Sequence, residues 1–394
     1  MAAATMAANL VAVAVTVVFT RLLGTDGYGS LAALLNLSVI LFVPGFALQV
    51  AAAREGTLGR LGAGGELATT LQRWTRTLVL GLVGVAVVSV LARAPLAAIL
   101  DVEQEWAAAA VPVTAGLWLL LSLERGLLQA DRAYPTVGWS IVLEAVGRLA
   151  IGVVLVEVGL GVTGAYLGTV GALLVMAIVL AAVLHRRLGA PTRDAPPHRL
   201  RALARDAALP IVALTLVAAL QNIDVILARH SLPDDPAGVY AATTVAAKAL
   251  VWIAVGLGMW LLPEAVRRGA AGADPRPVLL RAFALIGVVA VPALAVYAAV
   301  PRLVLGTAFG SEYESGDEVL LLLGVAYALL ALTYLAVQYL LGMHRRGPLW
   351  GLGVVALAEA LVLANLDSLR GFALAVLAVQ AAAAVITVGA ALRR

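Results

Sequence analysis

Residues 21–30 read Arg-Leu-Leu-Gly-Thr-Asp-Gly-Tyr-Gly-Ser, and they separate two long apolar runs. The three glycines suggest a phosphate-binding loop, but a loop of that kind ends in Gly-Lys-Ser/Thr and lies between a strand and a helix. No lysine follows here, and both flanking runs are too long and too rich in Ala, Leu and Val to be strands. We therefore interpret this stretch as a turn between two apolar helices.

The composition places these helices in a membrane. Hydrophobic residues make up 62% and charged residues 13% of the 394 residues, far from the balance of a soluble domain. Apolar stretches of about 20 residues, enough to cross a bilayer core about 30 Å thick, recur along the whole chain. We predict an all-α polytopic membrane protein with twelve transmembrane helices, at 2–20, 30–53, 77–97, 107–127, 136–157, 162–185, 207–229, 237–263, 279–300, 318–342, 347–364 and 371–392.

Several classes of site are excluded or not expected. The first span has the length of a signal peptide, but no basic residue precedes it, so we keep it as a helix. The chain has no cysteine, which excludes disulfides, thiolate metal sites and cysteine nucleophiles. The four histidines, His185, His198, His230 and His344, fall in different loops. We expect no metal, no cofactor and no catalytic residue.

The arginines orient the chain. The even-numbered loops and the C-terminus hold twenty arginines, Arg125 among them, whereas the odd-numbered loops hold five. The positive-inside rule then places both termini on the cytoplasmic side of the membrane and residues 21–30 outside. The basic loops are expected to touch anionic lipid headgroups, and the net charge of +4 requires no nucleic acid.

The sequence pattern of the first predicted turn, residues 21–30, occurs a second time in the chain. Residues 229–243 read Arg-His-Ser-Leu-Pro-Asp-Asp-Pro-Ala-Gly-Val-Tyr-Ala-Ala-Thr, with the arginine, aspartate, small residue and tyrosine in the order of residues 21–30. A second echo links 127–135 with 340–348, each following the fourth span of a half. In both copies we expect the glycines, such as Gly27 and Gly29, to adopt positive φ. Tyr28 and Tyr240 are expected to anchor at the outer interface.

This duplication predicts the domain organisation. Six spans per half is an even number, so the two six-helix lobes share one orientation and are related by a pseudo-two-fold axis along the membrane normal. We expect lobes at 1–185 and 207–394, joined by a basic, Pro-rich cytoplasmic linker at 186–206. Two parallel lobes with a central interface are typical of transporters that work by alternating access.

The chain resembles polysaccharide exporters and Wzx-type lipid-linked oligosaccharide flippases of the multidrug/oligosaccharidyl-lipid/polysaccharide (MOP) superfamily. The resemblance covers nearly the whole chain and rests on short motifs: Arg-Leu-Leu-Gly followed by Asp-Gly-Tyr-Gly at the first turn, 126–129 before a basic turn, Glu144 with Arg148, 238–240, and 262–263. The polar N-terminal segment usual in this family is missing. The resemblance implies transport of a polyprenyl-diphosphate-linked oligosaccharide across a bacterial plasma (inner) membrane. It also implies that the protein works with polysaccharide biosynthesis enzymes, with a proton or sodium ion as a possible coupling ion.

Ionisable residues inside spans are the candidate substrate contacts. Glu144 and Arg148 are four residues apart, so they share a helix face about 12 and 18 Å deep. Arg148 offers a planar fork for phosphate oxygens, although a structural ion pair is an equal alternative. Asp224 and Lys248 lie on consecutive antiparallel helices and could meet; Asp224 is also close enough to the outer end to be an interfacial residue.

Three further residues complete the candidate set. Asn36 lies inside the second span, where hydrogen bonding between helices is the alternative to ligand binding. Arg21 and Arg229 end the first and seventh spans at equivalent places in the two halves.

Rival functions remain open at this point. A drug/cation antiporter of the same superfamily needs a net-acidic cavity, whereas an anionic diphosphate needs a net-positive one. A major facilitator is disfavoured because the second loop lacks the Gly-Xaa3-Asp-Arg motif expected there. A membrane glycosyltransferase could use the acidic stretch 101–106, but the short outer loops leave no room for an acceptor domain, and capping of the fourth span is the alternative role.

Overall fold

The computed structural model describes residues 2–62, 64–192, 208–270, 272–343, 345 and 347–393, and within these ranges the chain is helical without strands. In hydrocarbon every backbone N–H and C=O must be satisfied internally, and an α-helix does this within one segment. The all-α prediction is confirmed.

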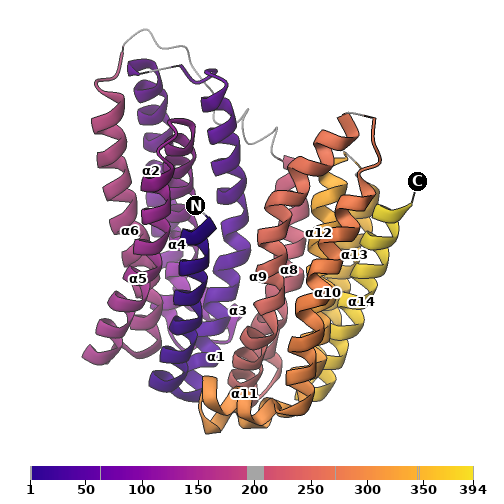
Figure 1. Cartoon of the computed structure of the whole chain (residues 1–394). Coiled ribbons are helices and arrows are strands. Elements are labelled where there is room, and N and C mark those ends of the chain that lie inside the picture. Colours follow the sequence, from indigo (N-terminus) through magenta and orange to yellow (C-terminus); the bar gives the residue numbers. More distant parts are fainter. Residues whose placement is uncertain are drawn as a thin grey trace. The chain divides into compact units, whose positions relative to one another are not determined.

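Figure 1 labels the helices of the described chain in sequence order. They are α1 (Ala2–Thr57), α2 (Gly65–Leu91), α3 (Arg93–Leu100), α4 (Glu105–Ala130), α5 (Tyr134–Leu155), α6 (Gly161–Leu188), α8 (Ala208–Ser231), α9 (Asp234–Ala270), α10 (Arg276–Ala299), α11 (Pro301–Ala308), α12 (Asp317–Gly342), α13 (Gly347–Leu363) and α14 (Leu369–Leu392). A π-helical turn, Val156–Leu160, joins α5 to α6, and a 3-10 turn, Ser311–Gly316, precedes α12.

The predicted spans coincide with these helices. By length and hydropathy, nine helical segments of the described chain are suited to cross a membrane, and α13 is a shorter apolar helix. Two of the nine hold more than one predicted span: Ala4–Thr57 bends at Gly24, and Tyr134–Leu188 contains both α5 and α6. The count of twelve stays a prediction.

The chain divides into two compact units, one formed by 1–15 with 37–215 and the other by 16–36 with 216–394. The end of the first predicted span, the turn after it and the start of the second span therefore group with the second half of the sequence. Most of the predicted linker, from 193 onward, lies outside the described residues, and α6 continues to Leu188. The predicted lobe limits and the membrane orientation stay predictions.

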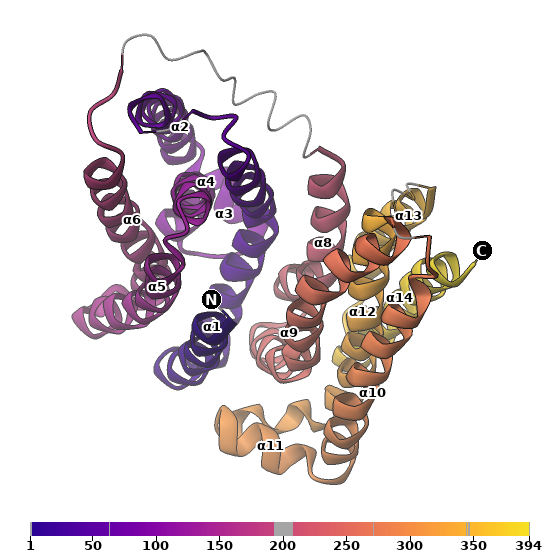
Figure 2. The same ribbon diagram turned by 45° about the horizontal axis from the view of Figure 1, so that its top comes forward.

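Within the first unit, α4 lies in the middle of the helix bundle and contacts α2, α5 and α6 (Figure 2). The helices α5 and α6 pack closely because small residues face each other. A Cβ on Gly168 would lie 2.6 Å from the backbone N and Cα of Gly152. Small residues spaced four apart, Gly164 and Gly168, let the two backbones approach in the manner typical of membrane helices.

Within the second unit, α12 packs against α9, α10 and α14, and the helices run side by side in one bundle (Figure 1). Large side chains fill this bundle: Tyr240, Tyr327 and Phe372 are fully buried. The Tyr240 and Phe372 rings pack edge to face, with centroids 5.2 Å apart. These tyrosines also carry hydroxyls that need partners inside the protein.

The turn at residues 21–30 is built differently from the prediction. In this stretch only Gly24 has positive φ, 70°, and residues 25–30 already belong to the second helical part of α1. The prediction of positive φ at Gly27 and Gly29 is therefore wrong. Gly29 serves close packing instead, since a Cβ there would lie 3.2 Å from the backbone N of Gly238.

The two copies of the duplicated stretch pack against each other in the second unit. A Cβ on Gly238 would lie 1.9 Å from the carbonyl oxygen of Thr25, so only glycine fits there. The Thr25 hydroxyl donates to Asp235, and Arg229 pairs with Asp26 at 2.7 Å and with Asp234 at 2.8 Å. The internal repeat is thus a packing interface between its own copies.

Neither tyrosine of the repeat anchors at a membrane surface. Tyr28 is buried in an edge-to-face contact with Tyr313, with ring centroids 6.5 Å apart, and Tyr240 is fully buried. The interfacial prediction is wrong because each ring fills space between helices of the second unit. The Tyr240 hydroxyl finds its polar partner inside, at Asp224.

Candidate functional site

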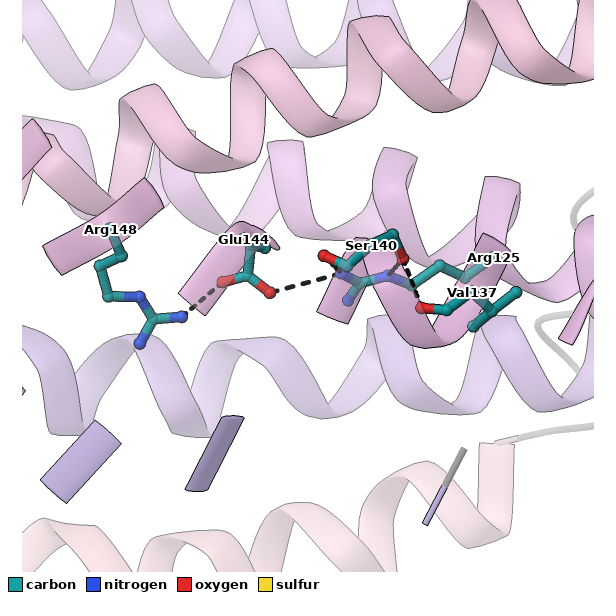
Figure 3. A network of polar contacts seen from close by, with 5 residues as sticks. All are labelled: Arg125, Val137, Ser140, Glu144 and Arg148. Carbon is teal, nitrogen blue, oxygen red and sulfur yellow. Dashed lines mark hydrogen bonds and ion pairs between the residues drawn. The ribbon is translucent and has the colours of Figure 1, made fainter. Parts of the chain in front are cut away.

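The first unit holds a buried chain of charged groups on α4 and α5. Figure 3 shows Glu144 between two arginines: Arg148 donates to Oε1 at 2.6 Å, and Arg125 approaches Oε2 at 3.5 Å. Arg125 also donates to the hydroxyl and the carbonyl oxygen of Ser140, both at 3.0 Å. The predicted pairing of Glu144 with Arg148 at a four-residue spacing is confirmed.

Arg125 was counted among the loop arginines, and that assignment is wrong. Its side chain is 3% exposed, and its guanidinium lies 5.6 Å from the centre of the Trp118 ring. The signal was present in the sequence, because Arg125 falls inside the predicted span 107–127. A buried guanidinium needs a carboxylate or carbonyl oxygens around it, and Glu144 and Ser140 supply them.

The two arginines of this chain differ in what they can still bind. Arg125 is enclosed, whereas the Arg148 side chain is 25% exposed. The Nε of Arg148 has no hydrogen-bond partner among the described residues, and a guanidinium carries five N–H donors. Arg125, Glu144 and Arg148 together carry a net charge of +1, and Arg148 lies at the accessible end of this row of charged groups.

The second unit holds a separate polar cluster around Asp224. This carboxylate is fully buried, and its Oδ2 accepts hydrogen bonds from Tyr240 at 2.7 Å and from Tyr327 at 2.6 Å. Its Oδ1 has no partner in the described part of the chain. The alternative of an interfacial Asp224 is therefore wrong.

Lys248 belongs to the same cluster but is held by amides. Its Nζ donates to Asn36 at 2.8 Å and to Asn222 at 3.3 Å, and it lies 5.5 Å from the centre of the Tyr327 ring. Each asparagine donates from its own nitrogen to a carbonyl oxygen four residues earlier, at 2.7 Å, which turns its oxygen toward the ammonium. No ion pair within 4 Å joins Lys248 to Asp224 in the described chain.

Glu359 was missed by the sequence analysis. It lies on α13, is fully buried, and accepts a hydrogen bond from Gln380 of α14 at 3.3 Å. Gln380 also donates to the carbonyl oxygen of Leu220 at 2.7 Å, and Oε2 of Glu359 has no partner among the described residues. An acidic residue in the middle of the predicted span 347–364 was the available signal.

The remaining candidates lie at the turns. Arg229 holds the two repeat copies together, and the exposed Arg21 donates to the carbonyl oxygen of Thr307 at 3.4 Å. Beside them is a pocket of about 700 Å³ whose charged lining, in the part of the chain that is described, consists of carboxylates: Asp235, Glu312, Glu318 and Asp367. Such a pocket repels an anionic headgroup.

The acidic stretch 101–106 forms a local structure. Glu105, in the first turn of α4, accepts a hydrogen bond from Arg93 of α3 at 2.8 Å, and Arg93 lies 5.0 Å from the centre of the exposed Trp106 ring. No side chain of this stretch caps the N-terminus of α4 with a hydrogen bond, but Glu105 in the first turn favours the helix dipole. Neither here nor elsewhere in the described chain do three His, Asp or Glu side chains gather as they do around a metal ion.

Comparison with protein families gives a clear match. Residues 1–263 match the sequence model of the family described as polysaccharide biosynthesis protein. A comparison with curated protein sequences gives no match.

Solved structures show the fold. An inward-facing multidrug resistance MATE transporter of the MOP superfamily aligns with a TM-score of 0.80 at 13% identity, over 98% of this chain and 93% of the other. The lipid II flippase MurJ, in an inward closed conformation, gives 0.74 at 10% identity, over 99% and 86%. A MOP superfamily transporter from Pyrococcus furiosus gives 0.63 at 14% identity, over 99% and 91%. The fold is therefore the two-lobe helical fold of these transporters.

Proposed function

Because the chain belongs to the polysaccharide biosynthesis protein family, we propose that it is a flippase that moves a polyprenyl-diphosphate-linked oligosaccharide across the plasma membrane by alternating access. The family match carries the proposal, and a fold shared with the lipid II flippase MurJ supports it. Its substrate is a lipid with an anionic diphosphate and a polar glycan, so the protein must offer fixed cations inside the membrane.

Arg148 is the proposed headgroup contact. It is the accessible end of a net-positive chain, and its unpartnered Nε and its partial exposure leave donors for phosphate oxygens. Glu144 holds one side of the guanidinium, so the fork points in a defined direction. Arg125 holds Glu144 in place from the opposite side.

The cluster in the second unit is the proposed site for the coupling cation, a proton or a sodium ion. Asp224 and Glu359 each keep one buried oxygen without a hydrogen bond from the described residues. An unpaired buried carboxylate oxygen is costly, and a bound proton or cation would remove that cost. Lys248 supplies a nearby positive charge, and Asn36 holds its ammonium in place. A proton or cation bound at the two carboxylates would therefore change the electrostatic environment of this ammonium.

The two proposed sites call for different substitutions. In proteoliposomes carrying a fluorescent undecaprenyl-diphosphate sugar, Arg148→Gln should slow flipping about 10- to 150-fold, the loss of a charge-assisted hydrogen bond. Arg148→Lys should keep part of the rate because the charge survives without the fork. The control is Arg267→Gln, because the Arg267 side chain is 78% exposed. Flipping at the wild-type rate by a well-folded Arg148→Gln protein would overturn the headgroup assignment.

Imposed proton or sodium gradients test the proposed coupling site. Asp224→Asn and Glu359→Gln should each abolish the acceleration of flipping by an imposed proton or sodium gradient while substrate-driven flipping continues. Lys248→Met should leave Asp224 without its nearby cation and lower protein levels, and Asp224→Asn in the same chain should restore them if the role of Lys248 is electrostatic support. A stable Lys248→Met protein that binds the lipid poorly would instead place Lys248 at the headgroup.

The second candidate function is a cation or drug antiporter. The observation that favours it is the charge of the second-unit cluster, where the buried carboxylates Asp224 and Glu359 outnumber the ammonium of Lys248. Efflux of a cationic dye from proteoliposomes that do not flip the lipid-linked sugar would support this function over the flippase.

A further inference from the structure

The first unit contains a second buried carboxylate that the proposed transport cycle does not use. Glu124 of α4 is 1% exposed, and its Oε2 has no hydrogen-bond partner among the described residues. Its neighbour in sequence, Arg125, is occupied with Ser140 and Glu144. A buried carboxylate without a donor is expensive, so a donor from outside the chain would stabilise it.

Glu124 lines a pocket of about 450 Å³ between α2 and α6, with α4 behind them. The volume falls within the range of small-molecule sites, about 300–1,000 Å³. The wall has two kinds of surface. Arg76, His185, Gln72 and Thr75 supply polar groups, whereas apolar side chains line the rest: Ala68, Leu71, Val79, Ala181, Leu184 and Leu188.

The pocket lies where the uncharged parts of its helices end. Arg76 is the last charged residue before the uncharged run 77–92 of α2, and His185 is the first ionisable residue after the uncharged run 161–184 of α6. Charged residues at the ends of such runs lie at the level of the lipid headgroups. The α2 side chains beyond the pocket, including Val83, Val87 and Val88, are exposed as a lipid-facing helix requires.

We propose that this pocket binds the headgroup of an amine-bearing phospholipid, of the phosphatidylethanolamine type. The phosphate would take donors from Arg76, with His185 beside it, and the primary ammonium would donate to the carboxylate of Glu124. The acyl chains would then leave along the apolar wall of α2 and α6. This headgroup carries one negative and one positive charge. The two charges match the Arg76 guanidinium and the Glu124 carboxylate that line the pocket.

The choice among lipids follows from hydrogen bonding. A primary ammonium has three donors, whereas the trimethylammonium of phosphatidylcholine has none. Phosphatidylglycerol brings a phosphate and hydroxyls but no positive charge for Glu124. The site should therefore prefer the ethanolamine lipid over both of the others.

Native mass spectrometry of the purified full-length protein with each lipid tests this preference. We expect phosphatidylethanolamine to bind about tenfold more tightly than phosphatidylcholine, the effect of one charge-assisted hydrogen bond. Glu124→Gln should remove the preference, because the amide is a weaker acceptor for an ammonium. Arg76→Gln should weaken binding of all three lipids. The matched control is Glu66→Gln, because Glu66 is an exposed acid on α2.

Thermal stability of the wild-type protein gives a second readout that needs no variant. Added phosphatidylethanolamine should raise the apparent Tm more than phosphatidylcholine or phosphatidylglycerol does. Equal binding and equal stabilisation by all three lipids would overturn the proposal and assign Glu124 a purely internal role. A preference for phosphatidylglycerol, or an ethanolamine preference that persists in Glu124→Gln, would overturn it as well.

Discussion

Removing Glu144 should destabilise the first unit far more than removing Arg148. In Glu144→Ala the guanidinium of Arg125 stays buried, 3% exposed, with only Ser140 left as a partner in the network of Figure 3. Breaking a buried pair by deleting one partner costs about 3–5 kcal/mol, because the other charge is left uncompensated. Arg148 is partly exposed, so its loss should cost about 1 kcal/mol or less.

These free energies correspond to measurable changes in melting temperature. For a unit of this size about 1 kcal/mol shifts Tm by about 2–4 °C, so Glu144→Ala should lower the apparent Tm by about 6–20 °C. Arg148→Met should change it by less than about 4 °C. Tryptophan fluorescence in detergent is a suitable signal, because Trp118 lies beside Arg125.

A double variant separates charge from packing. Arg125→Met with Glu144→Met replaces the pair by apolar side chains, which is often neutral or stabilising for a buried ion pair. The double variant should therefore melt at a higher temperature than Glu144→Ala. The reasoning fails if Glu144→Ala melts within 2 °C of the wild type, or if Arg148→Met is destabilised as much as Glu144→Ala.

Three further predictions concern the backbone and the membrane orientation. Gly238→Ala places a Cβ 1.9 Å from the carbonyl oxygen of Thr25 and should sharply reduce the amount of folded protein in the membrane. The control is Gly256→Ala, in open space on the same helix, which should not reduce it. Equal yields of the two variants would contradict the close packing at Gly238. Gly168→Ala, whose Cβ would lie 2.6 Å from the α5 backbone, should lower the apparent Tm, and an unchanged Tm would mean that α5 and α6 can separate freely. Thr25→Cys should react with an impermeant thiol reagent in intact cells and Ala190→Cys only after permeabilisation, and the reverse pattern would invert the predicted orientation.

Helix positions could be predicted from the sequence because a membrane helix needs about 20 apolar residues, and that signal is local. The pairing of Glu144 with Arg148 could be predicted for the same reason, since a four-residue spacing places them on one face. What sequence alone could not supply was the partner across helices. Arg125 is close to the end of its predicted span, so the sequence places it in a loop. Lys248 could meet Asp224 by its position in the sequence, but in the structure the amide oxygens of two asparagines hold its ammonium.

The turn shows a second limit. Three glycines in residues 21–30 are equivalent by composition, yet only Gly24 has a backbone conformation that favours glycine, and Gly29 is needed for space. The difference depends on Gly238, more than two hundred residues later. Glu359 was missed for a simpler reason: an isolated acid in an apolar run has no neighbouring motif, and only its burial beside Gln380 identifies it.

The packing of the two repeat copies has a consequence for biosynthesis. Thr25 and Asp235, which hydrogen-bond in the finished protein, are 210 residues apart. Ribosomes add about 5–20 residues per second, so about 10–40 s pass between synthesis of the first residue and synthesis of the second. During that time residues 16–36 are already made, while Arg229 and Gly238 do not yet exist. The first hairpin of the chain must therefore stay in the membrane in a provisional arrangement, and it reaches its final neighbours only when α9 has been inserted.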